Sequence, residues 1–104
     1  MNLDDTLIAL ADETRRSILQ RLSGGKARVT ELAAPFDISL NSVSKHIRIL
    51  ERAGLVRRHV CGRDHYLTLD PKPLNEVAEW IAKSRDFWTA RLDSLENVLK
   101  RSRK

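Results

Sequence analysis

The sequence is most informative between residues 39 and 54, which read Ser39-Leu40-Asn41-Ser42-Val43-Ser44-Lys45-His46-Ile47-Arg48-Ile49-Leu50-Glu51-Arg52-Ala53-Gly54. Val43, Ile47 and Leu50 recur at spacings of four and three, as apolar residues do on one face of an α-helix. Ser39 is a residue type that caps helix N-termini, and Gly54 is a type that ends helices. The run therefore predicts an amphipathic helix over residues 39–53.

A shorter helix is expected just upstream. Thr30 is placed to cap it, and Pro35 keeps it brief because proline removes a backbone hydrogen bond. Residues 36–38 then form a turn. Two helices joined by a turn of three or four residues make a helix-turn-helix, whose second helix enters the major groove of DNA. The segment from Thr30 to Leu50 fits this geometry.

The outward face of the 39–53 helix carries polar and basic residues. Asparagine can bond two atoms of adenine, serine suits base edges or phosphates, and lysine and arginine reach guanine or phosphate. Free N–H groups at the helix N-terminus can also hold a phosphate. A merely solvated face is the alternative, but the neighbouring turn favours DNA. The predicted contacts from this helix are Ser39, Asn41, Ser42, Ser44, Lys45 and Arg48.

After Gly54 the pattern changes to that of β-structure. Residues 55–60 and 65–69 predict two strands, and Gly62 permits a tight turn between them. This hairpin, residues 55–69, is expected to place three arginines along the DNA backbone, with the third at the tip near the minor groove: Arg57, Arg58 and Arg63. The alternative is that these charges only protect an edge strand from aggregation.

Further helices are predicted on both sides of this unit. Apolar residues favour a first helix over residues 3–11, and Asp12 is placed to cap a second that ends at Gly24-Gly25. A proline-containing break precedes a last helix, residues 73–101. The predicted fold class is mainly α with a small β-hairpin, in the order α-α-α-α-β-β-α. At 104 residues the chain is expected to form one domain, residues 1–104.

The net charge of +5 is concentrated in two places. Residues 41–65 hold six Lys or Arg against two Asp or Glu, and residues 100–104 hold four Lys or Arg, which favours a polyanionic partner. The single cysteine, Cys61, excludes an internal disulfide and fits a reducing cytoplasm. An acidic N-terminus and the lack of a long apolar run argue against secretion or a membrane partner, so a cytoplasmic protein is expected.

Three motifs together resemble one known family. The string Ala9-Leu10-Ala11-Asp12-Glu13-Thr14-Arg15-Arg16-Ser17-Ile18-Leu19 resembles the opening "ALADPTRRxIL" of the ArsR/SmtB-type repressors, with Glu13 where Pro is common. Residues 43–56 are similar to the family's "VSxHLxxLxxAGLV" core. Gly62-Arg63 followed by Tyr66-Leu67-Thr68-Leu69 is similar to its wing. The resemblance covers nearly the whole chain.

This resemblance implies a winged helix-turn-helix homodimer, paired through the first and last helices, 3–11 and 73–101. It implies a sequence-specific transcriptional regulator, a homodimeric repressor that binds a palindromic operator in double-stranded DNA through helix 39–53 and wing 55–69. The positions that match the family's base-contacting residues are Leu40, Asn41, Ser44 and Lys45. Leu40 departs from the polar residue often found there and suits a thymine methyl group instead.

Both ligand sets of the family's metal-sensing members are missing from the sequence. Residues 30–34 contain no thiol, and the last helix contains no histidine. The chain therefore resembles the subgroup without a known metal site, and we expect neither a metal nor another cofactor. A zinc site formed by His59, Cys61 and His65 in the wing is the alternative, and a redox role for Cys61 is another.

Other classes of function are separated by simple tests. An enzyme is not expected, because no Ser/His/Asp set, carboxylate pair or Gly-rich phosphate loop can be placed in a cleft. A winged helix used only for protein assembly would bind its partner unchanged after neutralisation of Lys45 and Arg48. A sensor would hold its ligand near Trp80 and Trp88, although such aromatic residues more often form core or dimer contacts. The sequence does not name an inducer, whether a small molecule or a protein.

Overall fold

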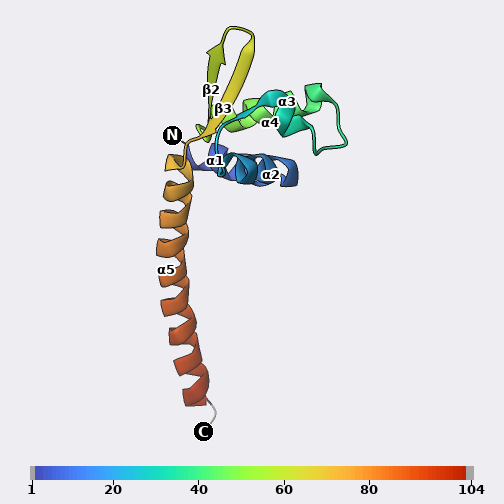
Figure 1. Cartoon of the computed structure of the whole chain (residues 1–104). Helices are drawn as coiled ribbons and strands as arrows, with labels where there is room; N and C mark the ends of the chain where they lie inside the picture. Colours follow the sequence, from blue (N-terminus) through green and yellow to red (C-terminus); the bar gives the residue numbers. More distant parts are fainter. Residues whose placement is uncertain (1, 103–104) are drawn as a thin grey trace.

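The computed structural model describes residues 2–102 as a helical body from which one long helix projects (Figure 1). The mainly helical fold class with a small hairpin is confirmed. Among these residues no helix is long and apolar enough to cross a bilayer. The elements in chain order are α1 (Leu3–Leu10), α2 (Glu13–Leu22), β1 (Ala27–Arg28), α3 (Val29–Ala33), α4 (Leu40–Arg52), β2 (Val56–Cys61), β3 (Asp64–Leu69) and α5 (Lys72–Ser102).

The sheet contains one strand that the sequence did not predict. β1 pairs antiparallel with β3, with Ala27 opposite Leu67 and Arg28 opposite Tyr66. The sheet order is therefore β1-β3-β2, and the element order is α-α-β-α-α-β-β-α rather than α-α-α-α-β-β-α. Two residues are too few to show the alternating pattern of a strand, and this pairing depends on contacts made far along the chain.

The β2–β3 hairpin is confirmed, although its strands differ slightly from the predicted bounds. Cys61 lies opposite Asp64, so only Gly62 and Arg63 form the turn. Gly62 has a φ of 63°, in the left-handed region that glycine adopts without a steric penalty. The prediction that Arg63 lies at the tip of the hairpin is therefore confirmed.

The helix ends agree with the sequence at two of three predicted caps. The carboxylate of Asp12 accepts a hydrogen bond from the Arg15 N–H at 3.0 Å, and Ser39 Oγ accepts one from the Ser42 N–H at 3.1 Å. The prediction for Thr30 is wrong, because β1 runs directly into α3 and leaves Arg28 at the N-cap. Four residues, 35–38, separate the C-cap of α3 from the N-cap of α4, as expected for a helix-turn-helix.

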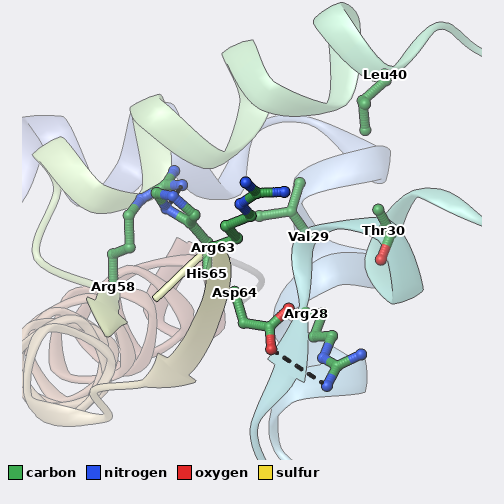
Figure 2. A pocket seen from close by; sticks show the side chains of 8 residues that line it. All are labelled: Arg28, Val29, Thr30, Leu40, Arg58, Arg63, Asp64 and His65. Atoms are coloured by element: carbon green, nitrogen blue, oxygen red, sulfur yellow. Dashed lines mark hydrogen bonds and ion pairs between the residues drawn. The ribbon is translucent and has the colours of Figure 1, made fainter. Parts of the chain in front are cut away.

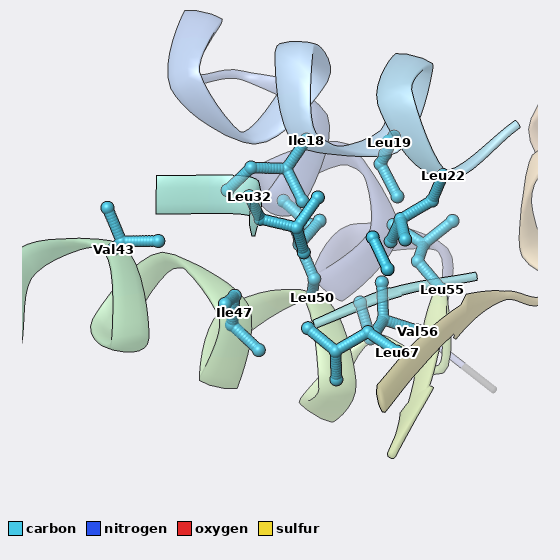
Figure 3. Packing of buried hydrophobic residues seen from close by; sticks show 13 residues of the cluster. Ile18, Leu19, Leu22, Leu32, Val43, Ile47, Leu50, Leu55, Val56 and Leu67 are labelled. Carbon is cyan, nitrogen blue, oxygen red and sulfur yellow. The ribbon is translucent and has the colours of Figure 1, made fainter. Parts of the chain in front are cut away.

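A single hydrophobic core fixes the orientation of α4 (Figure 3). Val43, Ile47 and Leu50, the three residues that predicted the helix, are fully buried. They pack with Ile18 of α2 and Leu67 of β3, among others. Burying each such side chain contributes about 1.5–3 kcal/mol, so the opposite face of α4 must point to solvent.

The last helix leaves the body after a short packed segment. α5 contacts α1 near its own start, and Val77 is its last buried residue within the described chain. The remaining turns extend away from the body (Figure 1). The Cα radius of gyration is 19.6 Å, whereas a compact chain of this length would have about 13 Å.

Candidate nucleic-acid interface

The outward face of α4 presents the residues that the sequence assigned to it. Asn41, Lys45 and Arg48 are exposed, and Ser44 is half-buried beside them. Ser39 and Ser42 are joined at the start of the helix, where their hydroxyl oxygens lie 3.0 Å apart. These two serines therefore cap the helix, and the other four residues form its polar surface.

Several cationic side chains on this side of the molecule have no partner in the part of the chain that the structure describes. Within residues 2–102, the side chains of Lys45, Arg48 and Arg63 form no hydrogen bond or ion pair. Their charges are available to an external anion without the loss of an existing contact. An arginine or lysine that already held a carboxylate would first have to release or share it.

The other two arginines of the predicted wing do hold carboxylates. Arg58 donates to Glu51 of α4 at 2.7 and 3.3 Å, and this hydrogen bond raises the pKa of Arg58 above its ordinary value. Arg57 donates to Asp70 at 2.9 and 3.2 Å. The backbone N–H of Lys72 lowers the pKa of Asp70, and Arg57 lowers it further. DNA contacts from Arg57 and Arg58 stay a prediction. To bind a phosphate, each guanidinium would have to divide its hydrogen bonds between that phosphate and the carboxylate that it already holds.

The two faces of the hairpin carry different groups. On one face His59 Nε2 lies 3.0 Å from Thr68 Oγ1. On the other face, which looks toward α4, His65 Nδ1 lies 3.1 Å from Arg58. The two histidines thus point to opposite sides, and the alternative zinc site with Cys61 is not assembled. No group of three His, Cys, Asp or Glu residues suited to a metal occurs among the residues described.

Behind α4 a buried arginine joins three helices. Arg15 of α2 is 9% exposed and donates to the carbonyl oxygens of Ala9 at 2.8 Å and Ile8 at 2.9 Å, at the end of α1. Its third contact is to His46 Nδ1 of α4 at 3.1 Å. Because arginine has no acceptor, His46 Nδ1 must accept here and the ring proton must lie on Nε2. Asp12 lies 3.7 Å from the same nitrogen.

A basic cleft of about 300 Å³ opens between α3, the start of α4 and the hairpin (Figure 2). Its lining includes Arg58 and Arg63, which the sequence proposed for DNA binding, and Leu40. It also includes Arg28 and Thr30, which were not predicted from the sequence as ligand contacts. Only the pairing of β1 with β3 brings these two residues to the hairpin, so the local sequence held no signal for them.

Comparison with known proteins agrees with this arrangement. A domain family described as "Helix-turn-helix domain" matches residues 10–59. The HTH-type transcriptional regulator Rv2034 of Mycobacterium tuberculosis is 38% identical over 91 residues, which cover 88% of this chain and 82% of that protein. The crystal structure of an ArsR family transcriptional regulator, RHA00566, matches with a TM-score of 0.80 and 44% identity, covering 84% of this chain and 96% of that one.

The chain belongs to the ArsR family of transcriptional regulators. Another relative, the transcriptional repressor SdpR of Bacillus subtilis (strain 168), is 33% identical over 79 residues, which cover 76% of this chain and 88% of that protein. The family resemblance and the winged helix-turn-helix fold predicted from the sequence are thereby confirmed. These relatives are transcriptional regulators, so this ArsR-family protein is not an enzyme.

Proposed function

We propose that this ArsR-family protein is a homodimeric repressor that binds a palindromic operator through α4 and the β2–β3 wing. One observation carries the proposal: the outward face of α4 and the tip of the wing present polar and basic side chains that have no partner within residues 2–102. We assign Asn41 and Ser44 to the bases, because residues near the start of a recognition helix commonly meet base edges. Lys45, Arg48 and Arg63 are assigned to phosphates or to the adjacent minor groove.

The other predicted contacts have supporting roles in this proposal. Ser39 and Ser42 hold the first turn of α4, whose free N–H groups face a phosphate. Arg58 ties the wing to α4 through Glu51, and Arg57 lies on the opposite face of the hairpin. Chromosomal DNA as the target places the protein in the cytoplasm.

A second copy of the chain is the proposed partner of α5. The exposed apolar residues recur at spacings of four, three and four, as in a helix–helix seam: Trp88, Leu92, Leu95 and Leu99, each between 53% and 62% exposed. α1, which contacts α5, also exposes an apolar side chain, that of Ile8, at 59%. Two-fold symmetry is the commonest way to cover such a surface. We therefore treat residues 1–104 as one domain whose terminal helices form the dimer interface.

The dimer sets the form of the operator. Two recognition helices related by a two-fold axis bind half-sites about 34 Å apart, one turn of DNA, so the operator is palindromic. A repressor is favoured over an activator because SdpR, a relative of similar length, is named as a repressor. Repression then follows from occupation of the operator.

Titrations that separate base reading from backbone binding test this proposal. The operator is first selected from a pool of random duplexes, and affinities for it and for a mixed-sequence duplex are measured at several salt concentrations. Asn41→Ala should cost about 1–3 kcal/mol on the operator and little on mixed DNA, with an unchanged salt slope. Arg63→Ala should weaken both and reduce the salt slope by about one ion.

The matched control removes a cation far from the interface. Lys83→Ala in α5, where the side chain is 76% exposed, should leave both affinities unchanged. Equal weakening of both duplexes by Asn41→Ala would show that α4 does not read bases. Partner binding that survives neutralisation of Lys45 and Arg48 would instead favour a winged helix that assembles only with protein.

A further inference from the structure

The basic cleft contains more unsatisfied donors than the proposed helix and wing contacts require. Arg28 uses Nε and Nη2 to bond Tyr66 Oη at 3.2 and 2.9 Å, and its Nη2 lies 3.5 Å from Asp64. Its Nη1 group makes no hydrogen bond among the described residues, and neither does the Thr30 hydroxyl. Together with the guanidinium of Arg63, three donor groups that have no partner among the described residues therefore line one cleft.

The charge of the cleft suits an anion. Three guanidinium groups, those of Arg28, Arg58 and Arg63, face a single carboxylate, that of Asp64. Asp64 is paired with Arg28, and Arg58 is paired with Glu51, which does not line the cleft. The guanidinium of Arg63 has no carboxylate partner among the described residues, so its full charge is available to a ligand. A planar guanidinium donates to two oxygens of a phosphate at once, so phosphate is the anion that this lining matches.

Arg28 is already held in position for such a ligand. Its guanidinium bonds the Tyr66 hydroxyl and lies 5.3 Å from the centre of the Tyr66 ring. Tyr66 is in turn fixed by the pairing of β1 with β3. A side chain that is already ordered loses less conformational entropy when it binds, which increases the affinity that a single contact can give.

The position of the cleft indicates where its phosphate comes from. One rim of the cleft is Leu40, the first residue of α4. The other rim is the hairpin, from which the guanidinium of Arg63 extends toward the start of α3 (Figure 2). Both rims belong to elements that the proposed function places on DNA. A DNA strand that crosses from one to the other has a phosphate in between. Contacts to phosphates fix the register of a protein on the duplex.

We propose that this cleft seats one backbone phosphate of the bound DNA, with Arg28 and Thr30 as a third contact beside α4 and the wing. The inference rests on the proposed function and adds a residue pair from the β1–α3 junction. The pair positions the protein on the duplex and does not read bases. Its loss should weaken operator and mixed-sequence DNA equally.

Titrations of a mixed-sequence duplex against variants of the full chain provide the first test. Arg28→Gln should weaken binding about tenfold and lower the salt slope by about one ion. Thr30→Val should weaken binding about threefold without changing the slope, because a hydroxyl-to-phosphate bond is lost but no charge. Lys26→Gln is the control, because it removes a cation whose Nζ lies 5.1 Å from the centre of the Tyr66 ring and which does not line the cleft. Tyr66→Phe removes the hydrogen-bond partner that holds Arg28 but removes no charge, so it should weaken binding less than Arg28→Gln and leave the salt slope unchanged.

The decisive measurement pairs a protein change with a DNA change. Single phosphates of the selected operator are replaced by neutral methylphosphonates. One replacement should weaken wild-type binding about tenfold and have no further effect on Arg28→Gln, because both changes remove the same contact. Additive losses at every phosphate would overturn the proposal. So would an Arg28→Gln effect no larger than that of Lys26→Gln.

The outcomes also separate this inference from the proposed function. Wild-type protein that binds neither duplex refutes both. Wild-type protein that binds DNA while Arg28→Gln and Thr30→Val bind equally well refutes the cleft alone. Inorganic phosphate is the remaining probe, measured by calorimetry without DNA. A Kd for phosphate below about 1 mM that is lost in Arg28→Gln would show a site for a free phosphorylated molecule. That result would overturn the assignment to the DNA backbone.

Discussion

Replacement of Arg15 by methionine should loosen the contact of α1 with α2 and α4. The Arg15 side chain is 9% exposed and makes three hydrogen bonds, two to carbonyl oxygens of α1 and one to His46 of α4. Methionine retains the apolar stem but none of the donors. The change therefore tests the polar network and leaves most of the packing intact.

The expected loss follows from those contacts. Each hydrogen bond contributes about 1 kcal/mol net, and the carbonyl of Ala9, left without its donor in a buried place, adds about 1–3 kcal/mol. The carbonyl of Ile8 keeps a second donor, the N–H of Ala11 at 3.2 Å. Freeing a long ordered side chain returns about 1–2 kcal/mol. The net destabilisation is therefore about 2–5 kcal/mol.

Thermal unfolding at one fixed protein concentration measures this loss, because the proposed dimerisation would make the midpoint depend on concentration. In a domain of this size about 1 kcal/mol shifts Tm by about 4–8 °C, so a fall of about 8–40 °C is expected. Arg16→Met is the matched control. Arg16 is exposed and makes one surface bond, to the carbonyl of Leu10 at 2.7 Å, and its loss should cost less than about 1 kcal/mol. Equal Tm shifts in the two variants would refute the structural role of Arg15.

Three further predictions concern the dimer, acid stability and metals. The wild-type protein should sediment as a dimer at tens of micromolar, and the double variant Leu92→Asp/Leu95→Asp as a monomer; a wild-type monomer would contradict the assignment of α5. The Arg15 backbone N–H lowers the pKa of Asp12, so the stability from this cap is present above pH about 4 and is lost as the pH falls through the lowered pKa. Urea unfolding should show Asp12→Ala losing about 1 kcal/mol at pH 7, whereas Asp12→Asn, which retains an acceptor, loses less and is less sensitive to acid. Zinc, cadmium and arsenite should leave operator affinity unchanged, and a tenfold loss that disappears in Cys61→Ser would place a metal in the wing.

The residues on α4 were predictable because its pattern is local. Val43, Ile47 and Leu50 define the buried stripe through the helical period alone, and that stripe also determines which residues face outward. The Gly62 turn was predictable for the same reason, since its backbone conformation is restricted by residue type. Local rules thus sufficed for α4 and for the position of Arg63.

Features that depend on long-range pairing were not predictable. β1 is too short to show a pattern, and it exists because Ala27 and Arg28 meet β3 almost forty residues later. The cap at Arg28 and the inclusion of Arg28 and Thr30 in the basic cleft follow from that pairing. The ion pairs of Arg57 and Arg58 also join residues from different elements, so the sequence showed their charge but not their partners.

The ion pair between Arg58 and Glu51 has a thermodynamic consequence for complex formation. It ties the wing to the last turns of α4 before DNA arrives, with both side chains less than one-third exposed. The two elements should then dock as one rigid body, without a folding step coupled to binding. The heat capacity change of binding should accordingly match the apolar area buried at the interface, with no additional negative contribution from ordering the hairpin. A wing that is already rigid before DNA binds also limits how far the protein can adapt to operators that differ from one another in groove width.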